Sequence, residues 1–117
     1  MAIRRIVKEG DPILRMKCRP VTEFGEKLNQ LLDDMHETLE QANGVGLAAP
    51  QVGYCRRFFI MHLGDVKIEA INPEIKKTSG KQYVLEGCLS VPNKWGYVTR
   101  PNKCKFRSRR PSGLRKT

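Results

Sequence analysis

The feature that most constrains the fold is a change in apolar periodicity near residue 43. Upstream of it, apolar residues recur every three or four positions, the spacing that places side chains on one face of a helix. These residues are Phe24, Leu28, Leu31, Leu32, Met35 and Leu39, while Asp33, Asp34, Glu37 and Glu40 lie off that face. We therefore expect a helix over residues 24–42, capped by Thr22 and ending near Asn43-Gly44.

Downstream of residue 43 the apolar residues fall in short runs that are typical of strands. The runs cover residues 57–63, 66–72, 83–85, 95–99 and 103–107. Gly64-Asp65 has the composition of a hairpin turn, and we expect Asn72-Pro73 to end the second strand. This order predicts an α+β fold in which one main helix packs on mostly antiparallel strands.

The length of 117 residues allows one hydrophobic core. No apolar run approaches the roughly 20 residues that span a bilayer, and the N-terminus lacks the apolar block of a secretion signal. We therefore expect a cytoplasmic protein without membrane contact. The four cysteines, Cys18, Cys55, Cys88 and Cys104, form no C-x-x-C pair and are expected to be reduced.

The net charge of +10 is concentrated at the C-terminal end. Residues 100–117 hold eight lysines and arginines and no acid. We interpret residues 1–106 as the folded domain and residues 107–117 as a basic, disordered tail. An alternative is that the tail attracts RNA or the ribosome through its charge.

Two motifs carry residues suited to chemistry. The first, G-V-G-L-A-A-P-Q at 44–51, places two glycines after the helix, where the backbone can adopt positive φ and approach a ligand closely. Gln51 ends this motif with an amide that can donate hydrogen bonds to an oxyanion. The second motif, E-G-C-L-S at 86–90, places Cys88 on a glycine turn, and its thiolate would be a good ligand for zinc or ferrous iron.

Both motifs, in this order and about forty residues apart, resemble the peptide deformylases, metal hydrolases that remove the N-formyl group from new polypeptides. The resemblance extends to Asp11-Pro12-Ile13-Leu14, Asp33-Asp34-Met35, Gln51-Val52-Gly53 and Asn72-Pro73. It implies that Cys88 is a metal ligand, and that Gln51 and the backbone N–H of Leu89 stabilise the tetrahedral intermediate. It also implies a substrate groove lined by Val45, Gly46, Glu86 and Gly87. The implied cofactor is Fe²⁺, or Zn²⁺ or Ni²⁺, and the implied partner is a formyl-methionyl peptide of a nascent chain.

The family's third motif, H-E-x-x-H, supplies two further metal ligands and a general base, and it does not occur in these 117 residues. His36-Glu37 begins like this motif, but the residue four positions after His36 is Glu40 and not a second histidine. We therefore interpret His36 as a helix residue and His62 as a strand residue. The resemblance therefore implies a truncated domain whose C-terminal catalytic helix is missing. We expect weak metal binding, little activity and an uncovered apolar helix face. Such a face predicts self-association, a partner that supplies the missing helix, or a loosely packed monomer.

Two other functional classes compete with a hydrolase. The chain could be a catalytically silent module that keeps the groove and binds peptide N-termini. It could also be a small nucleic-acid binder acting through residues 100–117, although Phe106 is the only aromatic residue there on which a base could stack.

Overall fold

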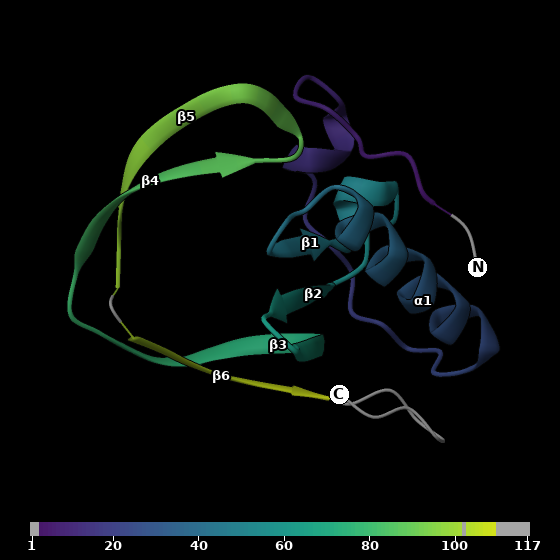
Figure 1. The fold of residues 1–117 in the computed structure, drawn as a ribbon. Helices are drawn as coiled ribbons and strands as arrows, with labels where there is room; N and C mark the ends of the chain where they lie inside the picture. Colours follow the sequence, from purple (N-terminus) through teal and green to yellow (C-terminus); the bar gives the residue numbers. More distant parts are fainter. Residues whose placement is uncertain (1–2, 102, 110–117) are drawn as a thin grey trace.

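The computed structural model describes residues 3–101 and 103–109 and has the α+β architecture that the periodicity predicts (Figure 1). One long helix lies against a sheet, and a two-stranded ribbon arcs away from them. In chain order the elements are η1 (Pro12–Arg15), α1 (Glu26–Gln41), β1 (Gly46–Ala48), η2 (Ala49–Val52), β2 (Phe58–Leu63), β3 (Val66–Ser79), β4 (Gln82–Cys88), β5 (Val91–Arg100) and β6 (Lys103–Arg109).

The strands form two antiparallel sheets. The larger has the order β1-β2-β3-β6, and β4 and β5 pair separately. Gly64 has a φ of 61° in the turn between β2 and β3, which confirms the predicted hairpin. Because β1 stands first in the strand order, it is an edge strand of the larger sheet.

The last three strands, β4 to β6, are longer than the sequence predicted. Strand β6 includes residues 107–109, which were predicted to belong to the tail. The remaining tail residues, 110–117, lie outside the described residues.

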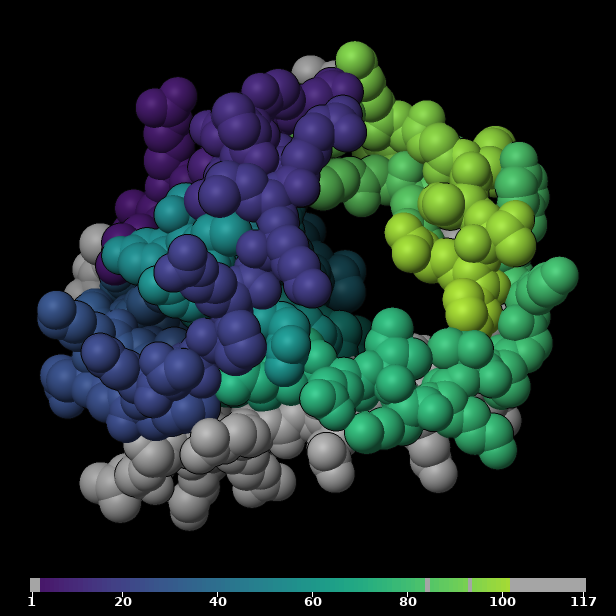
Figure 2. Space-filling model, turned by 180° about the vertical axis from the view of Figure 1, so that it is seen from behind, coloured from purple at the N-terminus to yellow at the C-terminus, as the bar shows by residue number. Residues whose placement is uncertain are grey.

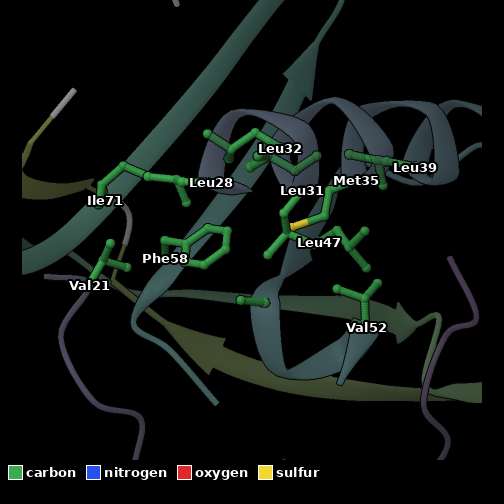
Figure 3. Packing of buried hydrophobic residues seen from close by; sticks show 12 residues of the cluster. Val21, Leu28, Leu31, Leu32, Met35, Leu39, Leu47, Val52, Phe58 and Ile71 are labelled. Atoms are coloured by element: carbon green, nitrogen blue, oxygen red, sulfur yellow. The ribbon is translucent and has the colours of Figure 1, made fainter. Parts of the chain in front are cut away.

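The core forms where α1 packs on the larger sheet (Figure 3). Of the six apolar residues in the predicted stripe, the five that lie in α1 are buried, namely Leu28, Leu31, Leu32, Met35 and Leu39. They belong to one cluster with Leu47, Phe58, Ile60 and Ile71, and each such buried side chain contributes about 1.5–3 kcal/mol. The prediction of an uncovered helix face is therefore wrong, because β1 to β3 already cover the stripe. The expected self-association through this face loses its basis.

The start of α1 differs from the prediction. The N-cap is Gly25 in an extended conformation, without a side-chain cap, so Thr22 does not cap the helix. Phe24 precedes the helix and packs against the core from outside it. The end of the helix is as predicted, since Asn43 adopts a φ of 55° and the Gly44 N–H donates to the Leu39 carbonyl at 3.2 Å.

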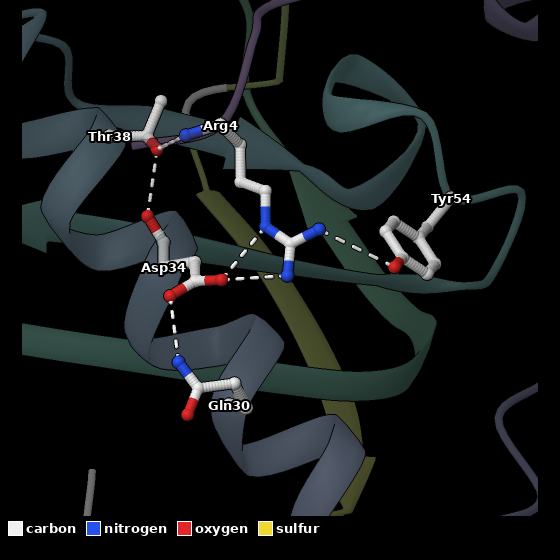
Figure 4. A network of polar contacts seen from close by, with 5 residues as sticks. All are labelled: Arg4, Gln30, Asp34, Thr38 and Tyr54. Atoms are coloured by element: carbon white, nitrogen blue, oxygen red, sulfur yellow. Dashed lines mark hydrogen bonds and ion pairs between the residues drawn. The ribbon is translucent and has the colours of Figure 1, made fainter. Parts of the chain in front are cut away.

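Asp34 is buried, although its position in the sequence pattern placed it off the apolar face. Asp34 can be buried because it forms an ion pair with Arg4, which lies thirty residues earlier in the sequence (Figure 4). Arg4 Nε and Nη2 lie 2.8 and 2.7 Å from Asp34 Oδ2, and Gln30 Nε2 donates to Oδ1 at 2.9 Å. The arginine also lies over the ring of Tyr54. The N-terminal segment thus covers one side of the helix.

The predicted end of the second strand at Asn72-Pro73 is also wrong, because β3 continues to Ser79. A register shift between Ile71 and Glu74 accommodates the proline, which has no N–H to donate to the ladder. Asn72 adopts a φ of 52°, and its side chain accepts from the Val21 N–H at 2.7 Å and donates to the Val21 carbonyl at 3.0 Å.

The β4–β5 ribbon carries exposed aromatic side chains, of which Tyr83 and Tyr97 stack with ring centroids 5.1 Å apart. Leu85 and Trp95 are also exposed there. Within the described part of the chain, no helix has the length and apolar character needed to cross a membrane.

Candidate functional site

The structure brings all seven residues of the predicted site to one cleft of about 770 Å³. The cleft lies between the β4–β5 ribbon and the body of the molecule, and Figure 2 shows an opening between the two. The predicted residues along it are Val45, Gly46, Gln51, Glu86, Gly87, Cys88 and Leu89. Their roles remain predictions, but the two motifs, forty residues apart in the sequence, do line the same cleft.

Gln51 is held in one orientation by its own motif. It lies in η2, and its Oε1 accepts a hydrogen bond from the Ala48 N–H at 3.0 Å. Its Nε2 therefore points toward the second motif, where it donates to Ser90 Oγ at 3.1 Å and lies 3.6 Å from Cys88 Sγ. An amide fixed at its oxygen end presents its N–H donors in a constant direction, as oxyanion stabilisation requires.

The N-terminal segment ties the two motifs together through its backbone. The Val7 N–H donates to the Gln51 carbonyl and the Glu9 N–H to the Ser90 carbonyl, both at 2.7 Å. Ser90 is buried between these contacts. Sequence reasoning missed these three residues as parts of the site. The only signal was that Ser90 is the last residue of the second motif.

The glycines act by close approach and not by unusual φ angles. The prediction that Gly44 and Gly46 adopt positive φ angles is wrong, because neither glycine does so. The residue with a positive φ at the end of the helix is Asn43. A Cβ on Gly44 would lie 2.7 Å from Leu39 Cδ1 and 3.0 Å from Leu89 Cδ1. Gly44 thus lets Leu89 of the second motif pack over the end of α1.

Gly87 is similarly tight against an aromatic ring. A Cβ there would lie 2.7 and 2.8 Å from two ring carbons of Trp95, which lines the cleft beside Cys88. The sequence pattern did not indicate Trp95 as a site residue, because its segment resembles an ordinary strand. The register pairs Gly87 with Trp95, and this pairing places the indole at the cleft.

Glu86 forms an ion pair at the exposed rim of the cleft. Arg100 Nε donates to Glu86 Oε2 at 2.7 Å, and this hydrogen bond lowers the pKa of the Glu86 carboxyl. The sequence interpretation counted Arg100 with the basic C-terminal residues. In the structure it ends β5 opposite Gln82, and its side chain reaches along the ribbon to Glu86 of the second motif.

The described residues do not fit a catalytic metal ion. Cys88 is exposed, but no group of three or more His, Cys, Asp or Glu side chains with ligand geometry occurs within residues 3–101 and 103–109. Both histidines are engaged elsewhere, since His36 Nδ1 lies 2.7 Å from His62 Nε2 and His36 Nε2 lies 2.7 Å from Glu69 Oε2. One thiolate is short of the three protein ligands that a catalytic site normally supplies.

Comparison with known proteins gives a consistent result. The family model described as polypeptide deformylase matches residues 3–115. A peptide deformylase of Agathobacter rectalis is 55% identical over 107 residues, which are 92% of this chain and 68% of that protein. The crystal structure of the Thermotoga maritima peptide deformylase has a TM-score of 0.88 and 41% identity, over 91% of this chain and 73% of that one.

A third match is a class I type b peptide deformylase of Acinetobacter baumannii crystallised with Met-Ala-Ser bound, at a TM-score of 0.85 and 33% identity. The match covers 91% of this chain and 76% of that one. Among the relatives compared, the chain spans from 62% to 77% of their own length. The similarity therefore extends over nearly all of this chain, whereas each relative has a further part that the match does not include.

Proposed function

The chain belongs to the peptide deformylase family, whose members are metalloenzymes, and from this premise we propose that its cleft binds the formylated methionyl end of a nascent peptide. The formyl carbonyl would lie against Gln51 Nε2 and the Leu89 backbone N–H. The peptide backbone would run along Val45, Gly46, Glu86 and Gly87. This assignment is consistent with the Met-Ala-Ser complex of the related Acinetobacter baumannii protein.

The observation that carries the proposal is the fixed amide of Gln51. Its oxygen is committed to the Ala48 N–H, so its two N–H donors face the second motif. Donors held in place before the reaction stabilise a developing oxyanion, and removal of one such donor costs about 3–4 kcal/mol in other hydrolases. Cys88 would be the residue of this cleft that holds a metal ion, and the described donors of this chain do not complete such a site.

The edge position of β1 supports an extended peptide as the ligand. Val45 and Gly46 lie at the start of this edge strand and also line the cleft. An extended peptide can add to such an edge through main-chain hydrogen bonds. The volume of about 770 Å³ lies in the range of sites that enclose small ligands, so the cleft would hold the first residues of a peptide.

For the 117-residue chain itself, we propose little deformylase activity and weak retention of Fe²⁺, Zn²⁺ or Ni²⁺. The reason is the donor set, because Cys88 would be the only ligand of the family's site among the described residues. The alternative is a catalytically silent module that binds peptide N-termini. These two hypotheses predict the same binding and differ in whether any turnover occurs.

Calorimetric titration with formyl-Met-Ala-Ser tests the binding, and a formate assay with metal analysis after dialysis tests the activity. Gln51→Glu keeps the oxygen that accepts from Ala48 but removes the N–H donors, so we expect at least about tenfold weaker binding. Gln30→Ala, which changes an exposed glutamine on α1, is the matched control and should bind like the wild type.

Equal affinity of Gln51→Glu and the wild type would contradict the role of Gln51. Stoichiometric metal after dialysis together with clear formate release would contradict the proposed low activity. Binding without turnover and without metal would favour the silent module over a weak enzyme.

A further inference from the structure

Cys18 and Cys55 lie side by side in the N-terminal half of the structure. Arg19 and Arg56 form an isolated parallel β-bridge, in which the Arg19 N–H donates to the Cys55 carbonyl at 3.3 Å and the Arg57 N–H to the Arg19 carbonyl at 2.8 Å. The preceding residues, Cys18 and Cys55, are therefore opposite each other, with side chains on the same face.

The side chains meet as the backbone register requires. Cys55 Sγ donates to the carbonyl of Lys17, the residue before Cys18, at 3.6 Å, so the Cys55 thiol lies against the segment that carries Cys18. Both cysteines are half-buried and reduced. Adjacent strands run about 4.8 Å apart, which is within the Cα separation of about 4.4–6.8 Å that a disulfide bridges without backbone movement.

We propose that Cys18 and Cys55 form a dithiol modification site, which small disulfides such as oxidised glutathione convert into an intramolecular disulfide. Neither cysteine belongs to the cleft, and the proposed deformylase function uses neither of them. The site would therefore respond to the thiol–disulfide balance independently of the metal and the substrate.

The order of the two steps follows from the surroundings of Cys18. Burial, and after it the neighbouring Cys55, raises the pKa of the Cys18 thiol, which makes Cys18 the poorer first nucleophile, so we take the attack by Cys55 as the first step. The Cys55 thiolate breaks the S–S bond of the small disulfide, forms a mixed disulfide and releases one thiolate. Cys18 then loses its proton, attacks Cys55 Sγ and releases the second thiolate.

The electrons and protons balance in this sequence. Two protein thiols are oxidised to one disulfide, and one small disulfide is reduced to two thiols that take up the two protons. No metal or further oxidant is required. Exposed Cys88 lies in another part of the fold, so it should stop at the mixed disulfide.

The new bond would join the segment before α1 to the entry of β2. It would close the loop from Cys18 to Cys55, which contains α1 and β1. Closing this loop lowers the conformational entropy of the unfolded chain and so stabilises the folded state. We expect a rise in melting temperature of about 5–10 °C on oxidation, reversed by dithiothreitol.

The test is incubation of the full chain with oxidised glutathione, followed by peptide mapping by mass spectrometry and thermal unfolding. The expected result is one linked peptide pair containing Cys18 and Cys55, with the higher melting temperature. In Cys18→Ser we expect a glutathione adduct that persists on Cys55. In Cys55→Ser we expect a markedly slower adduct on Cys18.

The mapping also identifies the results that would overturn the proposal. Separate adducts or free thiols at both positions of the wild type would show that the pair does not close. The same yield of the link in urea-unfolded protein would show that the fold does not direct it. Both readouts use the wild type, so they hold even where a serine variant folds poorly.

Discussion

His36 Nδ1 on α1 lies 2.7 Å from His62 Nε2 on β2, and the two rings are within 5° of parallel. Two facing nitrogens at this distance can share one proton but cannot both carry one. The other nitrogen of His36, Nε2, lies 2.7 Å from the buried Glu69 carboxylate on β3. The three side chains link the helix to two strands at the margin of the core.

This arrangement predicts that the protein loses stability when the pH falls below the normal histidine pKa. Burial lowers the pKa of His62 below its usual 6.5, and His36 and Lys67 lower it further, while Glu40 acts in the opposite direction. Below a pH of about 6.5 the unfolded chain therefore binds a proton that native His62 does not, so the free energy of unfolding decreases as the pH falls. Above that pH this contribution is constant.

His62→Gln tests the assignment, because its amide can still donate to His36 Nδ1 but does not titrate. Denaturant midpoints of variant and wild type should be compared between about pH 7.5 and 5, on either side of the normal histidine pKa. We expect a smaller loss of stability in the variant. Equal losses would place the pH dependence in the carboxylates and not in the histidine pair.

The buried carboxylate of Asp34 leads to a second prediction. Asp34→Ala leaves the guanidinium of Arg4 without its ion-pair partner and removes the bond from Gln30. Removal of one partner of a buried ion pair costs about 3–5 kcal/mol of stability. Because the Arg4 side chain is 31% exposed, we expect the free energy of unfolding to fall by only about 2 kcal/mol. Urea unfolding of variant and wild type measures this difference.

Gln30→Ala is the matched control for Asp34, since it removes one neutral hydrogen bond from an exposed glutamine to the same carboxylate and keeps the ion pair. We expect a change below about 0.5 kcal/mol. A large effect of Gln30→Ala, or a small effect of Asp34→Ala, would show that the pair with Arg4 does not dominate this network.

The burial of Asp34 also shows where sequence reasoning was insufficient. The helix stripe and the hairpin at Gly64 follow from local periodicity and turn chemistry, so they were predictable. Asp34 is buried because a residue thirty positions away pairs with it, and β3 continues through Pro73 because Asn72 bonds to distant Val21. Neither partner leaves a local signal in the sequence.

In the candidate site, too, some residues could be identified from local sequence motifs, whereas others depend on pairing with distant segments. The complete motifs were enough to select the seven residues that meet at the cleft. Trp95 lines the cleft, and Arg100 binds Glu86 at the rim, because β4 pairs with β5. Ser90 is held beside Gln51 by the N–H of distant Glu9. The β4–β5 ribbon was predicted too short, because its exposed aromatic residues do not alternate regularly with polar ones.

Gly44 gives a third prediction, which concerns packing between the motifs. In Gly44→Ala the new methyl group meets Leu39 Cδ1 at 2.7 Å, and Leu39 is fully buried, so it has little room to move. Overpacking of this kind costs about 1–3 kcal/mol. We expect that loss in urea unfolding, together with weaker binding of formyl-Met-Ala-Ser, because Leu89 must shift.

Gly96→Ala is the control for this substitution. A methyl group added to Gly96 would have no heavy atom within 4 Å apart from its chain neighbours, and the φ of Gly96 is not positive. The stability of this variant should remain within about 0.5 kcal/mol of the wild type. If Gly44→Ala proved equally neutral, the contact of Leu39 and Leu89 at this glycine would not be part of the folded state in solution.

The last prediction uses Trp95, the only tryptophan of the chain. Its side chain is 71% exposed and lines the cleft, so a bound peptide would cover the indole and shift its fluorescence to shorter wavelength. In Gly87→Ala the methyl group would overlap the indole, with ring carbons at 2.7 and 2.8 Å. Because the ring is exposed, it can swing away at little cost in stability.

We therefore expect Gly87→Ala to unfold at nearly the wild-type urea concentration but to lose most of the fluorescence shift on addition of formyl-Met-Ala-Ser. Gly96→Ala, on the next residue of β5 after the tryptophan, should keep the shift. An unchanged shift in Gly87→Ala would mean that the indole does not rest on Gly87 when the peptide is bound. Since Gly87 precedes Cys88, that result would also require a different peptide path beside the thiol.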